Sequence, residues 1–150
     1  MPSDLGGVER HRGREAALQL LYQWEICRLE PSALDEIKEV YWSVHPGPER
    51  RQAFADALVA GTIEHVAEID PLLEANADNW RLSRMAVVDR NVMRMAVYEL
   101  LHSDTPPAVV IDEALELART YGGDEAVPFV NGVLDSINRT RAIRRTPSTT

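Results

Sequence analysis

Arginine side chains gather at the two ends of this 150-residue chain, and the chemistry they suit is phosphate binding. The guanidinium group is planar and offers a fork of donors that matches phosphate oxygens and stacks on bases. All the basic residues but Lys38 are arginine, a bias that an arginine-rich genome explains at least as well, so their position is the stronger signal. The two clusters are Arg10, Arg12 and Arg14 near the start and Arg139, Arg141, Arg144 and Arg145 near the end.

The rest of the chain is acidic. Between Glu15 and Asn138 there are 9 basic and 22 acidic residues, and the whole chain has a formal charge of −8. A polyanion would be repelled by the average surface and attracted to the ends. We therefore expect any nucleic-acid binding to be local, although a solvated leader without a binding role accounts for the first cluster about equally well.

The first arginine cluster lies where a helix would begin. Gly13 in its middle disfavours helix by about 1 kcal/mol relative to alanine, and cations at a helix start oppose the helix dipole. We expect this segment to fray when free and to become ordered on RNA, because phosphates would relieve the charge penalty.

Catalysis and metal binding find little support in the sequence. The four histidines are scattered with no pair at i,i+4 spacing, and zinc-type Cys/His sets, phosphate loops and nucleophile elbows are absent. Cys27 is the single cysteine, so no disulfide can form within the chain, and it suits a small core position. We predict that the protein is not an enzyme and needs no cofactor or metal. The histidines are His11, His45, His65 and His102.

Helical periodicity dominates the elements that must position these residues, and no alternating strand pattern has useful length. We predict an all-α fold, a single compact helical bundle domain of about six or seven helices over residues 9–140, with a flexible leader (1–8) and a flexible arginine-containing tail (141–150). Neither a membrane span nor a secretion signal is present, so a cytoplasmic location is the default. The predicted helices cover about 9–29, 49–69, 72–77 and 83–102, with one starting at an Ser32 N-cap, one from Val110 to the Gly122-Gly123 stop and a last one through Pro128 and Ile137.

One glycine interrupts a strongly apolar helical pattern at Phe129-Val130-Asn131-Gly132-Val133-Leu134-Asp135. A glycine in such a place usually lets another backbone approach closely, so we expect Gly132 to lie at a tight contact and its replacement by leucine to disrupt packing. Phe129 suits either the core or a stacking face.

At these segments the chain resembles the bacterial transcription antitermination factor NusB family. The resemblance spans about Arg10 to Ile137, and residues 30–51 look variable. Its last segment is the most specific, and the ordered set is hard to obtain by accident. The segments are Arg14–Tyr22, Val88–Leu100, Ile111–Ala118 and Phe129–Asp135.

The resemblance implies a protein that pairs with a small-subunit ribosomal protein, NusE, and binds single-stranded boxA RNA in nascent ribosomal RNA transcripts. The complex, with other antitermination factors, helps RNA polymerase to read through terminators. By position, the implied RNA-binding residues are Arg10, Arg12, Arg14, Glu125 and Phe129, and the implied partner-binding residues are Tyr22 and Asp89.

Two alternatives remain open at this point. The same fold resembles the N-terminal RNA-binding domain of ribosomal RNA cytosine methyltransferases, and a protein-only adaptor would never touch nucleic acid. Four further arginines could extend the basic track, although pairing with carboxylates such as Asp78 or Asp89 is favoured for each. They are Arg81, Arg84, Arg90 and Arg94.

Overall fold

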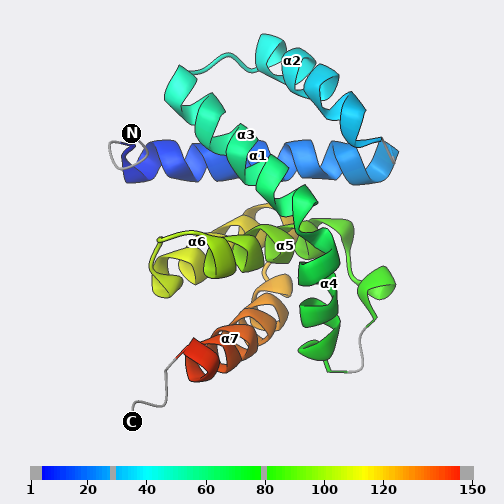
Figure 1. Cartoon of the computed structure of the whole chain (residues 1–150), viewed down its shortest axis with the longest axis vertical. Coiled ribbons are helices and arrows are strands. Elements are labelled where there is room, and N and C mark those ends of the chain that lie inside the picture. The colour runs from blue at the N-terminus through cyan, green and yellow to red at the C-terminus, as the bar shows by residue number, and fades with distance from the viewer. Residues whose placement is uncertain (1–4, 28–29, 79–80, 146–150) are drawn as a thin grey trace. The chain divides into compact units, whose positions relative to one another are not determined.

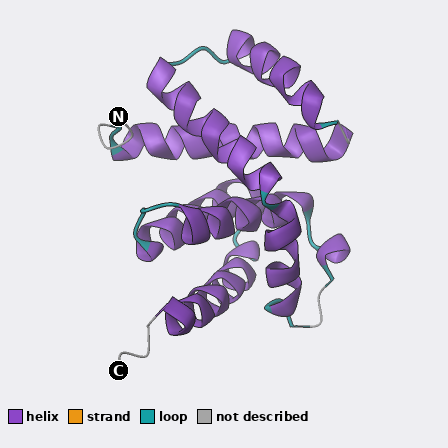
Figure 2. Cartoon of the chain, viewed as in Figure 1, coloured by secondary structure: helices purple, strands orange, loops and turns teal. Residues whose placement is uncertain are grey.

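The computed structural model describes residues 5–27, 30–78 and 81–145 and shows helices throughout, with no β-strand among these residues (Figures 1 and 2). The all-α prediction is confirmed. The α-helices are α1 (Gly7–Cys27), α2 (Leu34–Val44), α3 (Glu49–Glu64), α4 (Val66–Ala75), α5 (Val87–His102), α6 (Pro107–Gly122) and α7 (Ala126–Arg145), with short 3-10 turns η2 (Pro31–Ala33) and η3 (Leu82–Arg84).

The chain divides into two compact units, residues 1–63 and 64–150. In unit 1, α2 packs on α1, and α3 crosses α1 (Figure 1). Tyr41 on α2 donates a hydrogen bond to Gln19 Oε1 on α1 (2.9 Å), and Trp42 Nε1 donates to Asp56 Oδ1 on α3 (2.9 Å). These bonds tie the variable-looking second helix to both of its neighbours.

Unit 2 is organised around α5, which packs on α4, α6 and α7. Every residue of α5 from Arg90 to Val97 is buried, including the polar Arg90, Asn91 and Arg94. The contact of α6 with α7 completes the unit. A helix surrounded on several sides satisfies its apolar residues without a one-sided pattern.

One predicted helix break is wrong. The helical pattern predicts that the third helix ends at Asp70-Pro71, where Pro71 suits the first position of another helix. In the structure, α3 ends at Glu64 and His65 separates it from α4. The helix α4 then runs continuously through Pro71. Ile69 and Leu73, one helical turn apart on either side of Pro71, are fully buried, so tertiary packing holds the helix together across the proline.

Two predicted helix ends have different outcomes. α6 ends at Gly122, and Gly123 adopts φ +98, a left-handed conformation that glycine accepts without a Cβ clash. The predicted N-cap at Ser32 is not formed, because η2 occupies this turn and α2 begins at Leu34 without a side-chain cap.

Helix extends into both predicted terminal segments. α1 already begins at Gly7, and α7 continues to Arg145. Residues 1–4 and 146–150 lie outside the described residues, as do Asn79 and Trp80, which fall between the helices predicted over 72–77 and 83–102. The domain boundaries remain predictions. None of the described helices combines the length and the apolar character that crossing a membrane requires.

Candidate nucleic-acid and partner interface

The first arginine cluster lies on the opening turns of α1, where its three members differ in exposure. Arg12 is exposed, Arg10 is half-buried, and Arg14 is only 3% exposed. The backbone N–H of Arg10 donates to Gly6 O (3.0 Å), so the helix is formed at the cluster. Direct contact with phosphate is therefore open to Arg12 and Arg10, and Arg14 is placed differently from the expectation.

Arg14 is packed inside unit 1 together with Gly13 and Phe54. Its guanidinium carbon lies 5.3 Å from the centroid of the Phe54 ring on α3, a cation–π distance. A Cβ atom at Gly13 would lie 2.6 Å from Phe54 Cδ2. The glycine that seemed to weaken α1 is therefore the residue that admits the Phe54 ring, and Arg14 covers that ring.

An ion pair anchors the start of α1 to α3. Arg51 Nε and Nη2 donate to the two carboxylate oxygens of Glu9, at 2.6 and 3.2 Å. The hydrogen bond from Arg51 lowers the pKa of Glu9, and the nearby charges of Arg51 and Arg12 act in the same direction, against desolvation. This contact opposes the fraying that the charge pattern predicts.

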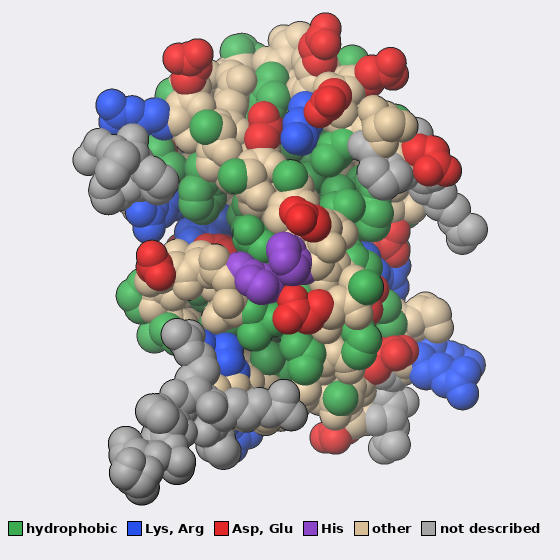
Figure 3. Space-filling view, in the orientation of Figure 1, with side chains coloured by type: hydrophobic (Ala, Val, Ile, Leu, Met, Phe, Trp, Pro, Cys, Tyr) green, Lys and Arg blue, Asp and Glu red, His purple; other side chains and the backbone are tan. Residues whose placement is uncertain are grey.

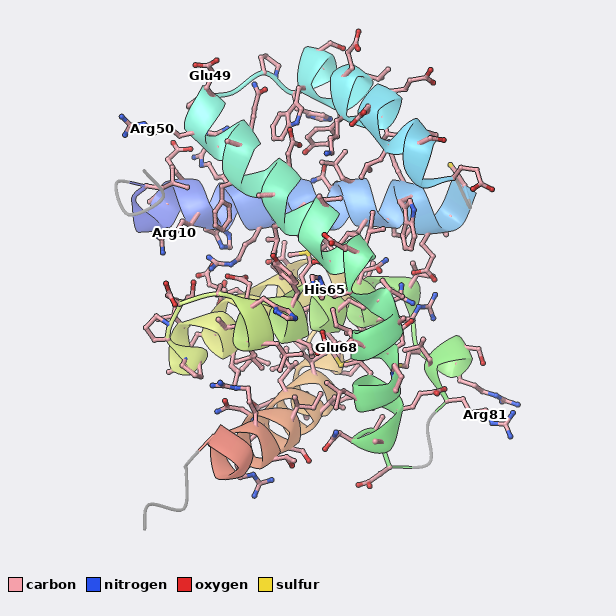
Figure 4. The ribbon with its side chains drawn as sticks, in the orientation of Figure 1. Arg10, Glu49, Arg50, His65, Glu68 and Arg81 are labelled. Atoms are coloured by element: carbon pink, nitrogen blue, oxygen red, sulfur yellow. The ribbon has the colours of Figure 1, made fainter. Side chains whose placement is uncertain are left out.

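Arg50 joins the exposed arginines of unit 1. It lies in the first turn of α3, and Figure 4 shows Arg10 and Arg50 at the same end of α1. Sequence reasoning missed Arg50 because it is remote from the first cluster along the chain. We call Arg10, Arg12 and Arg50 the basic edge.

The second half of α1 carries exposed apolar side chains. Tyr22 is 43% exposed and Ile26 is 52% exposed, and their i,i+4 spacing puts them on one face of the helix. Helical spacing alone would also allow a core position for the Tyr22 ring. Its exposure excludes that position and suits a contact with another protein. We call Tyr22 and Ile26 the apolar strip.

In unit 2, Asp89 and Glu125 lie close together, although the resemblance assigns them to different partners. Asp89 is in the first turn of α5, and a Cβ atom at Gly122 would lie 2.6 Å from its Oδ1. That oxygen is buried, with no hydrogen-bond partner among the described residues. Burial raises the pKa of Asp89, and the charge of Glu125 raises it further. We call Asp89, Gly122 and Glu125 the acidic corner.

The first two turns of α7 place the last predicted residues. Phe129 is half-buried, whereas Asn131 and Gly132 are exposed. A Cβ atom at Gly132 would meet nothing within 4 Å, so the expected tight packing at this glycine is wrong. The buried face of α7 passes through Val130, Val133 and Leu134 and leaves Gly132 on the other side.

Arg90 and Arg94 have structural roles. Arg90 Nη1 donates to the carbonyl oxygens of Leu82 and Met85, at 2.9 and 3.0 Å. Arg94 forms a two-point ion pair with Asp70, with N–O distances of 2.8 and 2.9 Å. Both are buried, and these bonds hold η3 and α4 against α5. The expected pairing with a carboxylate is found for Arg94, whereas the bonds described here for Arg90 go to backbone carbonyl oxygens.

The remaining basic residues are at the surface of unit 2. Arg81 and Arg84 are exposed at η3. Arg139 pairs with Asp135 (3.3 Å), and Arg141 Nη2 donates to Asn138 Oδ1 (3.3 Å), so the first two arginines of the end cluster engage their own helix. The side chains of Arg144 and Arg145 lie outside the described residues.

These features define a class of protein, a small all-helical protein with exposed charged and apolar side chains in defined places. The residues predicted for function lie on α1, at the start of α5 and around the start of α7. The sequence contains no nucleophile-elbow motif and no phosphate-loop motif.

Comparison with known proteins narrows this class to one family. The model of the NusB family matches residues 11–139. A transcription antitermination protein NusB from Solibacter usitatus is 46% identical over 133 residues, which cover 88% of this chain and 90% of the relative. A protein of the same name from Geobacter sulfurreducens is 43% identical, covering 87% and 94%. The chain belongs to the NusB family, which is not a family of enzymes.

Solved structures agree with this assignment. NusB of T. maritima is 38% identical with a TM-score of 0.76, covering 87% of this chain and 90% of that one. A second structure contains the antitermination factors NusB and NusE in complex with double-stranded RNA. Its matching chain is 30% identical with a TM-score of 0.78, covering 90% of this chain and 99% of that one.

Proposed function

We propose that this protein is a transcription antitermination factor that binds the boxA element of nascent ribosomal RNA together with the ribosomal protein NusE and promotes read-through by RNA polymerase. The observation that carries the proposal is the similarity over nearly the whole chain to a NusB that was crystallised with NusE and RNA. Action on nascent transcripts would place the protein in the cytoplasm of a bacterium.

The proposed RNA contacts combine attraction and recognition. Arg10 and Arg12 on the basic edge supply phosphate contacts, which position RNA without reading its sequence. Phe129, half-buried, offers part of a ring for base stacking, and the carboxylate of Glu125 can accept a hydrogen bond from a base amino group. Arg14 acts as a positioning residue, since its guanidinium covers Phe54.

The proposed NusE contacts are the apolar strip and the acidic corner. Tyr22 and Ile26 offer apolar area, and Asp89 offers a carboxylate oxygen that lacks a partner among the described residues. Asp89 as a whole is half-buried, so a donor on the partner would reach its carboxylate at the part that stays exposed. Because Asp89 and Glu125 adjoin, RNA and NusE would meet at the acidic corner. Selective binding of boxA RNA would then require both proteins.

The test is binding of fluorescent single-stranded RNA, measured by anisotropy near 0.15 M salt. The RNAs are a boxA-like oligonucleotide and its scrambled version, each with the protein alone and with NusE. We expect the pair of proteins to prefer boxA by tenfold or more, about 1.4 kcal/mol, and the protein alone to discriminate less.

One variant tests the proposed NusE contact, and a second serves as its control. Tyr22→Ala should weaken NusE binding and thereby the preference for boxA, whereas Arg119→Gln, at an exposed arginine paired with Glu116 on α6, should change neither. Equal binding of boxA and scrambled RNA in the presence of NusE would contradict the proposal. Binding of NusE without any RNA binding would favour a protein-only adaptor.

A further inference from the structure

Two histidines and a glutamate from distant parts of the sequence meet on the surface of unit 2. They are His65, Glu68 and His102, and their ligand atoms all lie within 4.8 Å of one another. Figure 3 shows histidine side chains at the surface with acidic side chains beside them, and Figure 4 shows His65 and Glu68 at the start of α4. The spacing in the sequence gave no sign of this cluster.

The backbone around the cluster is well fixed. His65 immediately precedes α4, and its carbonyl oxygen accepts hydrogen bonds from the N–H groups of Glu68 and Ile69, both at 2.9 Å. Ile69 is fully buried, so the first turn of α4 is held in place. His102 is the last residue of α5, which packs directly on α4.

The three side chains already face one another. His102 Nε2 lies 2.9 Å from Glu68 Oε1, and the His65 and His102 ring centroids are 4.1 Å apart. Tyr98 lies one turn before His102 and flanks the two imidazole rings. Its ring centroid is 5.5 Å from that of His65 and 5.4 Å from that of His102. Two imidazoles are thus held together beside one carboxylate.

This set of donors suits a transition-metal ion. Imidazole and carboxylate together are zinc ligands, and three protein ligands with an open fourth position is a common zinc arrangement. Ligand atoms around tetrahedral zinc lie about 3.3 Å apart, so the cluster must contract by about an ångström or more. The exposed side chains of Glu68 and His102 can supply this by rotation. The carboxyl end of the α5 dipole also favours a cation at His102.

We propose that His65, Glu68 and His102 form a surface site for a divalent transition-metal ion of the zinc class, which would link the start of α4 to the end of α5. The proposal concerns unit 2 alone and does not depend on the proposed role in transcription. A bound ion would stabilise the folded state, because the unfolded chain does not present the three ligands together.

The test uses the full chain with ZnCl₂ in calorimetric titration and with CoCl₂ in visible absorption. We expect one Zn²⁺ per chain, a higher melting temperature with zinc, and the visible bands of tetrahedral or five-coordinate Co²⁺. MgCl₂ should produce none of these, because magnesium prefers oxygen ligands. His65→Gln and His102→Gln should each weaken Zn²⁺ binding by about tenfold or more. Loss of a group that only supports a ligand already lowers metal affinity by about tenfold, and loss of the ligand itself should cost at least as much.

The matched control is His11→Gln. It removes a histidine that also faces a glutamate, Glu15 at 3.7 Å, where the described residues offer no third ligand. Circular dichroism checks that each variant keeps its helices. The proposal is overturned if the chain takes up no Zn²⁺ at micromolar concentrations, or if His65→Gln and His102→Gln bind it as tightly as His11→Gln does.

Discussion

An added methyl group would have opposite consequences at Gly13 and Gly132, although both glycines lie inside helices. At Gly13 the new atom would lie 2.6 Å from Cδ2 of the Phe54 ring, and the Arg14 guanidinium also contacts this ring. At Gly132 it would meet nothing within 4 Å. Packing against Phe54 therefore requires a glycine at position 13. No packing contact within the described chain requires one at position 132.

We predict that Gly13→Ala destabilises the protein by about 1 kcal/mol, because displacement of the Phe54 ring outweighs the gain in helix propensity. Gly132→Ala should stabilise it by about 0.5–1 kcal/mol, the usual gain at an exposed helix position. Urea unfolding of the two variants beside the natural chain measures both. A destabilised Gly132→Ala would mean that this glycine has a packing role after all.

Arginine shows the same dependence on surroundings. Arg90 and Arg94 are buried donors within unit 2, Arg14 is a buried cation over a ring, and Arg12 is exposed. The guanidinium group can do all of this because it combines a flat face with several N–H donors. The residue type alone therefore does not identify an RNA contact.

At the scale of the elements, the acidic corner is made where α5, α6 and the turn before α7 converge. The left-handed Gly123 ends α6 so that Gly122 faces Asp89. Two carboxylates are thereby brought together in a place where one is partly buried, and the pKa of Asp89 rises through burial first and the charge of Glu125 second.

We predict that Asp89→Asn raises stability at pH 7 by up to about 1 kcal/mol, a discounted figure because the site is partly solvated. A pKa higher in the folded than in the unfolded state means that ionisation opposes folding. The contribution of Asp89 to stability therefore falls as pH rises through the ordinary pKa of aspartate, about 3.9, and the penalty is complete above the folded pKa.

The measurement for Asp89→Asn is the melting temperature between pH 4 and pH 7. The advantage of the variant should grow with pH over this range, and Asp112→Asn, at an exposed carboxylate on α6, should show no such trend. An Asn variant that is less stable than the natural chain at pH 7 would show that the Asp89 carboxylate is stabilising where it lies.

At the scale of the whole molecule, the charge of −8 limits how RNA can bind. An acidic protein attracts RNA only where cations are exposed and concentrated, and two of the central arginines are already engaged within unit 2. The basic edge is the concentration of this kind in unit 1 that adjoins the predicted RNA-binding segment. Few phosphate contacts imply a modest dependence on salt.

We predict a slope of log affinity against log salt of about −2 for the protein alone on single-stranded RNA, since each phosphate contact contributes about 0.7 and the basic edge has three arginines. The double variant Arg10→Gln/Arg12→Gln should flatten the slope by about 1.4. Arg14→Ala should lower stability and leave the slope unchanged. A slope near −5 in the natural chain would require phosphate contacts by basic residues beyond the basic edge.

Local pattern was sufficient to determine the helical class, the end of α6 at Gly122-Gly123 and the segments that resemble the NusB family. Helix periodicity and turn chemistry depend on neighbours within a few residues, so the sequence contains them directly. The break at His65 escaped this reasoning, because buried Ile69 and Leu73 carry α4 through Pro71.

Only the tertiary structure decided which side chains of each type are buried and which meet. It placed the Arg14 guanidinium over the ring of Phe54 and left the space around Gly132 empty. It also brought Asp89 beside Gly122 and the His65 ring beside the His102 ring. These outcomes depend on which faces of separate helices pack together, and that choice is made by contacts between residues far apart in the chain. Composition and spacing are the same whichever faces meet, so they could not distinguish these arrangements.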